Sequence, residues 1–400
     1  MNKKKVTIIL MVFIAIFSTF VFVKNNSNFE ITNEINNKSK KNNDLLTMNL
    51  EQTAGTGDYK TVTQSEWPTE GYKFNTELSR CENGSELSWD DVNKKILMSG
   101  VSADKCYVYF DIARFDKLCN TSTLACHVAK LYTGTQGENG IYYHNTSLTN
   151  GAGDNNYRYA GANPNNYICL GSDATTCPDD NLFRIIGVFG DKVKVIKDKS
   201  VVKMHWDTSN YNTWSISSLN TYLNGTYLTS MGTLSDKIDV ATWKVGGNTW
   251  DNISVSTAKE VYDYEIKNPS TTASTGETEY SAKIGLMYVS DYMFAVLQDN
   301  WTLVAYNSND ATKDYRAIKA ENWLYLGSDE YTITRSSKNS ADVFAIYSSG
   351  EVYSYSVSCN SDEPLPCSVY AKYARPSFYL ISSVEYSGGT GTSSDPIRIN

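Results

Sequence analysis

Residues 169–197 read CLGSDATTCPDDNLFRIIGVFGDKVKVIK, and this stretch decides the fold. The apolar run Leu182–Phe189 and the alternating run Val193–Lys197 flank Gly190-Asp191, a dipeptide that suits a two-residue hairpin turn of type II′. The stretch therefore predicts two antiparallel strands in a buried sheet. Cys169 and Cys177 precede the first strand, and their role as a metal site, a reactive pair or a disulfide has to be decided from the rest of the chain.

The chain has eight cysteines, which fall into four neighbour pairs along the sequence. The pairs are Cys81 with Cys106, Cys119 with Cys126, Cys169 with Cys177, and Cys359 with Cys367. Sequence alone does not fix the connectivity, but an even number of cysteines in an exported chain favours disulfides between these neighbours. No C-x-x-C motif occurs and only three histidines are present, so neither a metal nor a cofactor is predicted.

The N-terminus carries an export signal. Lys3, Lys4 and Lys5 precede the apolar run Val6–Val23, VTIILMVFIAIFSTFVFV, and such a basic flank stays on the cytoplasmic side. The run is longer than a usual signal-peptide core, and no small-x-small cleavage site follows it. We expect residues 1–24 to be an uncleaved transmembrane helix, with a cleaved signal and a secreted protein as the alternative. In both cases the main body is extracytoplasmic.

The net charge limits the classes of molecule that the chain is expected to bind. Four lysines and no acidic residue lie in residues 1–24, so the rest of the chain carries a formal charge of −12, against −8 for the whole. An acidic body is a poor match for nucleic acid, and the membrane is contacted only through the N-terminal helix.

Composition divides the remaining chain into three parts. Residues 25–63 are rich in Asn, Lys and Thr and predict a disordered stalk. Residues 64–115 show short alternating runs with turn signals and predict a small all-β module tied by Cys81 and Cys106. Residues 116–400 predict an α+β domain with antiparallel pairing, because strand patterns and a few helices follow one another without a βαβ rhythm.

Four helices are expected in that domain. The first lies within residues 116–131 and is capped by Ser122 or Thr123. The second starts near Ser215 or Ser217 and ends at Asn224-Gly225. The third covers residues 257–266 and the fourth begins at Ser290.

Several motifs between residues 130 and 400 together resemble an uncharacterised bacterial cell-surface domain family. They include YTGTQGENGIYYHN, YRYAGANPNNYICLGSDATTCPDDNLFRIIGVFGDKVKVIK, AKIGLMYVSDYMFA and YARPSFYLISSVEYSGGTGTSSDPIRI. That family is similar in fold to C-type lectins and to formylglycine-generating enzymes, and the stretch before it resembles the small β module that often precedes such a domain. The resemblance implies a C-type-lectin-like fold and a surface location.

The chemistry of those two groups does not carry over. No cysteine site matches the copper site of the formylglycine-generating enzymes. The calcium motifs of C-type lectins are also incomplete, because Leu365 follows Glu363-Pro364 and no Trp-Asn-Asp occurs. The resemblance thus implies a scaffold without a known reaction.

We expect a membrane-anchored, non-catalytic recognition or adhesion protein that binds a glycan or a surface protein through its loops. The candidate contacts are aromatic residues in or near polar loops, which are Tyr142, Tyr143, Trp206, Trp250 and Trp301. An enzyme on the same fold, either a hydrolase or an oxidoreductase, and a purely structural envelope protein are the alternatives.

Overall fold

The structure is a computed structural model. The structure describes residues 6–11, 46–52, 56–63, 72–90, 95–100, 103–119, 121–269, 277–357 and 371–399. The chain divides into two compact units, Met1–Leu118 and Cys119–Asn400, here called unit 1 and unit 2.

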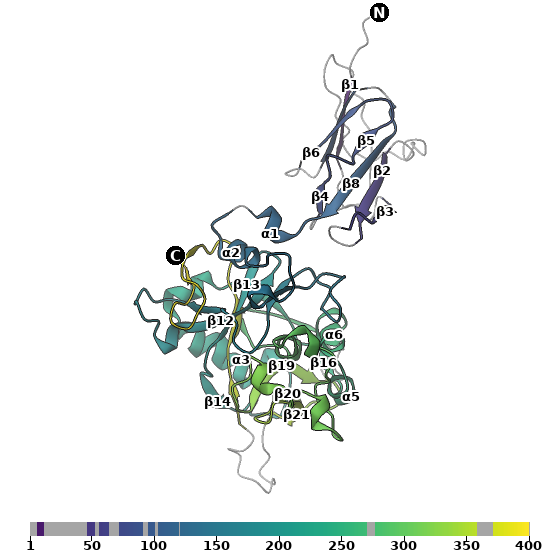
Figure 1. Ribbon diagram of the computed structural model, residues 1–400. Coiled ribbons are helices and arrows are strands. Elements are labelled where there is room, and N and C mark those ends of the chain that lie inside the picture. The colour runs from purple at the N-terminus through teal and green to yellow at the C-terminus, as the bar shows by residue number, and fades with distance from the viewer. Residues whose placement is uncertain are drawn as a thin grey trace, which may run out of the picture. The chain divides into compact units, whose positions relative to one another are not determined.

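Unit 1 is built from two sheets (Figure 1). One sheet has the order β1-β7-β6, and the other has the order β3-β2-β8-β4 with β5 paired to β8. The elements are β1 (Val6–Met11), β2 (Leu46–Glu51), β3 (Tyr59–Val62), β4 (Tyr72–Phe74), β5 (Arg80–Cys81), β6 (Glu86–Asp90), β7 (Lys95–Gly100), β8 (Cys106–Ile112) and the short helix α1 (Phe115–Leu118).

Strands β2 and β3 correct the expected stalk, whose predicted range extends to residue 63. Met48 and Leu50 are buried on one side of β2, which pairs in parallel with β8 and antiparallel with β3. The Asn-rich composition of the wider segment hid the apolar–polar alternation in LTMNLE, which is typical of a strand. The polar side chains Asn49 and Glu51 on its other side are buried as well. Residues 12–45, with most of the expected stalk, lie outside the described residues.

The core of unit 1 is small and gathers side chains from four strands. It contains Met48, Leu50, Phe74, Ile96, Val108 and Phe110. Trp89 and Phe74 meet Phe110 edge-on at ring-centroid distances of 5.0 and 5.5 Å. A core of this size buries little apolar surface, so a covalent tie adds substantially to its stability.

Unit 2 is dominated by two mostly antiparallel sheets. The first has the order β18-β23-β13-β12-β10-β9, with β11 on β12, and the second has the order β14-β22-β19-β20-β21, with β16 on β19. The strands of the first are β9 (Ile141–Tyr143), β10 (Tyr157–Tyr159), β11 (Tyr167–Cys169), β12 (Leu182–Phe189), β13 (Lys192–Lys197), β18 (Ile284–Gly285) and β23 (Ser377–Tyr379). Those of the second are β14 (Val202–Met204), β16 (Gly247–Asn248), β19 (Glu330–Ser336), β20 (Asp342–Ile346), β21 (Val352–Ser356) and β22 (Lys372–Ala374).

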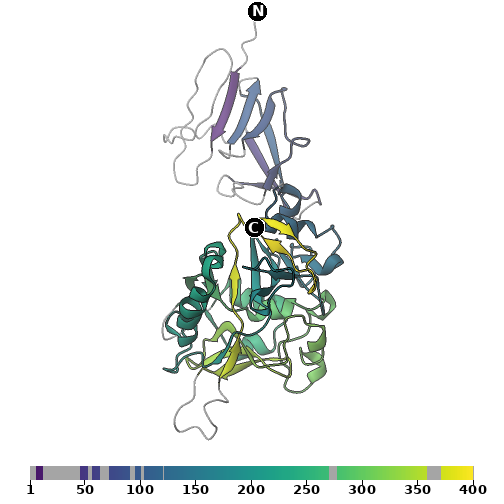
Figure 2. The same ribbon diagram turned by 90° about the vertical axis from the view of Figure 1, so that its left-hand side faces the viewer.

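Two further strand pairs complete unit 2. They are β15 (Ala241–Lys244) with β17 (Glu279–Ala282), and β24 (Tyr386–Gly388) with β25 (Arg398–Ile399). The segment that leads into β24 lies against the start of helix α2 (Leu124–Lys130), where Leu124 N–H donates to the carbonyl of Val384 (Figure 2). The two ends of unit 2 are thereby joined.

The hairpin expected from the opening stretch is present as β12 and β13. Residues Phe189 and Lys192 pair across the turn, and Gly190 has a φ of +62°, a conformation that glycine adopts without a steric penalty. A register shift between Ile185 and Gly187 bulges β12. A Cβ at Gly187 would lie only 2.0 Å from the carbonyl oxygen of Tyr157, so the neighbouring strand β10 requires a glycine there.

The helices of unit 2 are short. They are α2 (Leu124–Lys130), α3 (Ser218–Tyr222), α4 (Leu228–Ser230), α5 (Trp250–Ser254), α6 (Ala258–Tyr262) and α7 (Val289–Phe294). π-Helical turns η5 (Leu223–Tyr227) and η7 (Asp263–Lys267) extend α3 and α6. The 3-10 turns are η2 (Glu138–Gly140), η3 (Asp179–Asn181), η4 (Trp214–Ile216), η6 (Gly232–Lys237), η8 (Gln298–Asn300), η9 (Ala311–Lys313) and η10 (Lys319–Glu321).

The capping predictions hold, whereas one helix end was wrong. Thr123 and Ser217 cap α2 and α3 by accepting backbone N–H groups. The helical run from α3 does not end at Asn224-Gly225, because it continues through η5 into α4. The Asn224 side chain instead bonds both the N–H and the carbonyl of Ile284, which fastens the run to β18.

The coarse part of the predicted fold class is confirmed, since the chain mixes α and β and is rich in strands with few helices. Of the expected membrane anchor, Val6–Met11 forms β1, and the rest of residues 1–24 lies outside the described residues. Within the described ranges, no helix has the length and apolar character to cross a membrane.

Candidate functional site

The three described cysteine pairs are disulfides, as the neighbour pattern predicted. They join Cys81 to Cys106, Cys119 to Cys126 and Cys169 to Cys177. Cys359 and Cys367 lie outside the described residues. In the opening stretch, Cys169 and Cys177 therefore close a local loop in front of β12.

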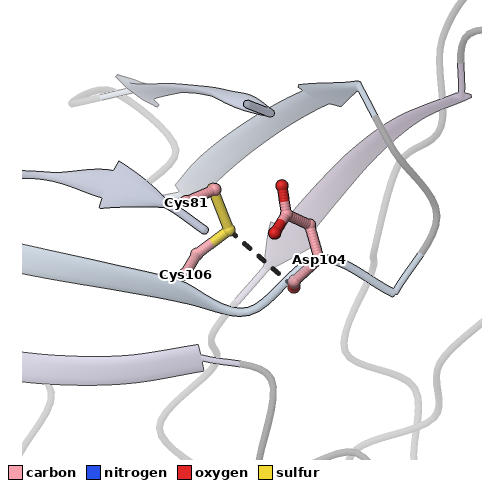
Figure 3. A group of neighbouring side chains, drawn as sticks. All are labelled: Cys81, Asp104 and Cys106. Atoms are coloured by element: carbon pink, nitrogen blue, oxygen red, sulfur yellow. Dashed lines mark hydrogen bonds between the residues drawn. A yellow bond between two sulfur atoms is a disulfide. The ribbon is translucent and has the colours of Figure 1, made fainter. Parts of the chain in front are cut away.

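One group in the described part of the chain has the donor atoms and spacing of a metal site, namely Cys81, Asp104 and Cys106 (Figure 3). Its two sulfur atoms are bonded to each other, so they are not available as thiolate ligands. Burial raises the pKa of Asp104, but hydrogen bonds from Ser85 and Asn83 outweigh it and leave the pKa lowered. The group is a disulfide beside a carboxylate that holds the 83–85 turn.

The aromatic residues expected as exposed contacts are mostly in the core, which corrects that expectation. Tyr142, Tyr143, Trp206 and Trp301 are all buried. Trp250 opens α5, and its side chain lies outside what the structure describes.

These rings pack against other core residues. The Trp301 ring lies 5.1 Å from that of Tyr142 and 5.2 Å from that of Phe294, and its indole N–H donates to the carbonyl of Val296. Trp206 lies 5.1 Å from Trp214. Tyrosine and tryptophan next to polar loops in the sequence thus reflect core packing, since a large ring buries more apolar area than any other side chain.

A surface pocket of about 280 Å³ lies between η2 and the loop that follows β10. Its walls are Asn139, Gly140, Ala160, Gly161, Ala162, Asn163, Pro164 and Asn165. The asparagines at 139, 163 and 165 are exposed, and each amide carries both donors and an acceptor. No titratable side chain is among these walls, so the pocket offers hydrogen bonds without an acid, a base or a nucleophile.

The two walls of the pocket are held against each other. Ala160 N–H donates to the carbonyl of Gly140 at 2.8 Å. Gly161 N–H donates to the carbonyl of Ala295 at 2.9 Å, which ties the second wall to the end of α7. A Cβ at Gly140, whose φ is +70°, would come within 2.9 Å of the Cβ of Pro164. The pocket is therefore framed by close backbone contacts rather than by long side chains.

Arg184 on β12 supports the 163–166 loop from beneath. Its guanidinium donates to the Asn166 side chain at 2.8 Å and to the carbonyl of Pro164 at 3.2 Å. It is stacked over the rings of Tyr167 and Trp323, with its central carbon 4.1 and 4.7 Å from their centroids. Burial lowers the pKa of Arg184 to about 10, so the arginine stays a cation at neutral pH and keeps the loop in place.

The sequence contains one local signal at this site. The run GANPNN between two expected strands places three asparagines and a proline at Gly161–Asn166. Such a run predicts a turn, but only the fold shows that η2 faces it and that Asn166 is buried as a support.

Three pairs of buried ionisable groups in unit 2 form ion pairs. Arg158 and Asp154 approach to 2.5 Å, Lys194 and Asp291 to 2.5 Å, and Arg375 and Glu330 to 2.7 Å. None of their members lines the pocket.

Comparison with known proteins gives no assignment, because no family model, no curated protein and no solved structure matches this chain.

Proposed function

We propose that this chain is a membrane-anchored extracytoplasmic protein whose C-terminal, C-type-lectin-like domain recognises a glycan or a surface protein without catalysing a reaction. The observation that carries this is the amide-lined pocket at η2 and residues 160–165. Exposed amides on a fixed backbone frame suit hydroxyl and amide groups of a ligand, which both donate and accept hydrogen bonds.

The disulfides support the location. Disulfides persist in oxidising compartments, and three pairs occur in the described ranges. The lysine-flanked apolar run at residues 6–23 is the feature that would export and hold the chain.

Binding is tested by screening the purified extracytoplasmic chain against arrays of neutral glycans and against surface proteins of its own cell. Asn165→Ala should weaken a detected interaction by about fivefold, since one neutral hydrogen bond contributes about 1 kcal/mol. Asn309→Ala, an exposed asparagine outside the pocket, is the matched control and should bind as the wild type does. A ligand that binds all three forms equally would place recognition elsewhere, and no ligand in either screen would refute the proposal.

Anchoring is tested separately by cell fractionation. We expect the chain in the membrane fraction and sensitive to protease added outside the cell. Mature protein in the medium that begins downstream of Val23 would show a cleaved signal instead.

A further inference from the structure

We propose that Lys194 and Asp291 become joined by an intramolecular isopeptide bond, with Glu265 as the group that moves the proton. The Nζ atom of Lys194 lies 2.5 Å from Oδ2 of Asp291. The two side chains are only 1% and 5% exposed. This pair and its surroundings have no part in the binding pocket, so the proposal stands apart from the proposed function.

The two residues come from elements far apart in sequence. Lys194 lies in the middle of β13, a central strand of the first sheet of unit 2, and Asp291 lies in the first turn of α7. Asp291 is fixed by the N–H of Tyr288, which donates to the same Oδ2 at 2.8 Å. The carboxyl group is thus fixed, and a rigid strand holds the amine next to it. Such an arrangement turns a bimolecular reaction into an effectively unimolecular one.

Aromatic rings surround the amine. Nζ of Lys194 lies 4.5 Å from the ring centroid of Tyr288, 5.5 Å from that of Trp243, 5.6 Å from that of Tyr379 and 5.7 Å from that of Phe189. Such a cage keeps water away from the reacting atoms, which favours loss of water over hydrolysis. Burial lowers the pKa of Lys194, although the charge of Asp291 opposes this, and the free amine is the nucleophilic form.

Glu265 lies at the same end of α7. Its two carboxylate oxygens accept the N–H groups of Val289 and Ser290 at 2.9 and 2.8 Å, immediately before Asp291 in the chain, and the Thr334 hydroxyl also donates to it. Burial raises the pKa of Glu265 to about 7, so this carboxyl group can both give and take a proton at neutral pH.

The step balances without a further reactant. A proton passes from the Lys194 ammonium to the Asp291 carboxylate, which gives a neutral amine and a neutral acid in surroundings that disfavour charge. Nζ then attacks Cγ of Asp291, Glu265 transfers a proton from the nitrogen to a leaving hydroxyl, and one water molecule departs. The C–O bond is replaced by a C–N bond, with no oxidation or reduction.

The same strand carries an internal comparison. Lys192, two residues earlier on β13, pairs with Asp239 at 2.7 Å, but these side chains are 37% and 22% exposed. Water reaches that pair, so it lacks the dry surroundings that favour loss of water over hydrolysis. We therefore expect a bond at Lys194 and none at Lys192.

The experiment is a tryptic map of the full chain after denaturation and reduction of its disulfides. Trypsin cleaves after an unmodified lysine, so cleavage after Lys192 should proceed and cleavage after Lys194 should be lost. The peptide 193–197 should appear joined to the peptide 284–313, with a mass lower by one water molecule than the two peptides together. Complete cleavage at Lys194 in folded wild-type protein would overturn the proposal.

Two variants separate the roles. Lys194→Arg keeps the positive charge but has no amine, so trypsin should cleave after position 194 and the peptide 284–313 should appear unlinked. Glu265→Gln should give unlinked peptides in a protein that is folded by circular dichroism. Linked peptides in folded Glu265→Gln would refute the role of Glu265, and the wild-type map decides the bond itself even where a variant does not fold.

Discussion

Two pairs of buried carboxylates, one pair in each unit, are held in different ways. In unit 1, Glu51 accepts the main-chain N–H groups of Gly57 and Ile112, and the carboxylate of Asp104 accepts those of Asn83 and Ser85. In unit 2, Glu330 and Asp291 face the cationic side chains of Arg375 and Lys194, whereas Glu265 is held by main-chain N–H groups like the two acids of unit 1.

This difference matters for how each unit can fail. Main-chain donors stay in place when side chains are exchanged, so Glu51 and Asp104 depend on the backbone of unit 1 and on the disulfide next to Asp104. An ion pair between two side chains is broken when either one is substituted, and the remaining charged side chain then stays buried without its partner. Unit 2 should therefore be sensitive at its ion pairs, and unit 1 at its disulfide.

The largest effect is expected from Glu330→Ala in unit 2. Arg375 would remain buried without its carboxylate, which typically costs about 3–5 kcal/mol. Urea unfolding followed by hydrogen exchange should show an earlier transition in peptides from residues 121–399, while peptides from unit 1 keep theirs. The double variant Glu330→Gln with Arg375→Met is the control and should recover part of the loss, and equal stability of Glu330→Ala and wild type would contradict the comparison.

Removing the Cys81–Cys106 disulfide should act on unit 1 in the same assay. The bond closes a separation of 25 residues, and the chain-entropy model gives a stabilisation of about 3.5 kcal/mol for such a loop. Cys81→Ser with Cys106→Ser should lower the urea midpoint of unit 1 alone. Removing Cys169 and Cys177 together is the matched control, which should leave unit 1 unchanged.

The pH dependence of stability should also differ between the units. Burial raises the pKa of Glu265 to about 7, so the folded state holds a proton that the unfolded state releases at a lower pH. This contribution is present below pH about 4.5 and is lost as pH rises to about 7, by about 3 kcal/mol in all.

The effect of Glu265 is isolated by subtracting the profile of Glu265→Gln, because Lys194, Asp291 and Tyr288 lie near the same end of α7. Wild type minus variant should fall between pH 4.5 and 7 for peptides of unit 2. A difference that is flat over this range would mean that Glu265 titrates normally.

Local signals in the sequence predicted the parts of the fold that depend on near neighbours. The hairpin around Gly190-Asp191, the caps at Thr123 and Ser217, and the three described disulfides all follow from residues within a few positions of one another or from the order of cysteines. These features depend on local backbone conformation and on residues that lie close together along the chain, so they can be predicted from residue types and their spacing.

The features that were not predicted, or were predicted wrongly, depend on contacts between distant segments. Asn224 reads as a helix end, but its side chain is committed to Ile284, so the helix continues. The ion pair of Lys194 likewise depends on the packing of two elements, because its partner Asp291 lies 97 residues away. The asparagines of the pocket come together because two loops meet in the fold. Charge and aromatic content in the sequence do not say which side chains become buried.

The smallest effect on stability is expected at Lys192. It tests whether an ion pair in unit 2 has to be buried for its loss to destabilise the unit. Lys192→Ala removes a partly exposed pair with Asp239, and such pairs contribute about 0.5 kcal/mol or less in moderate salt. The urea midpoint of unit 2 should hardly move, and the small difference between variant and wild type should shrink further as salt is added. A loss as large as that of Glu330→Ala would mean that the pair itself, rather than its burial, stabilises the sheet, and the contrast between Lys192 and Lys194 on β13 would then fail.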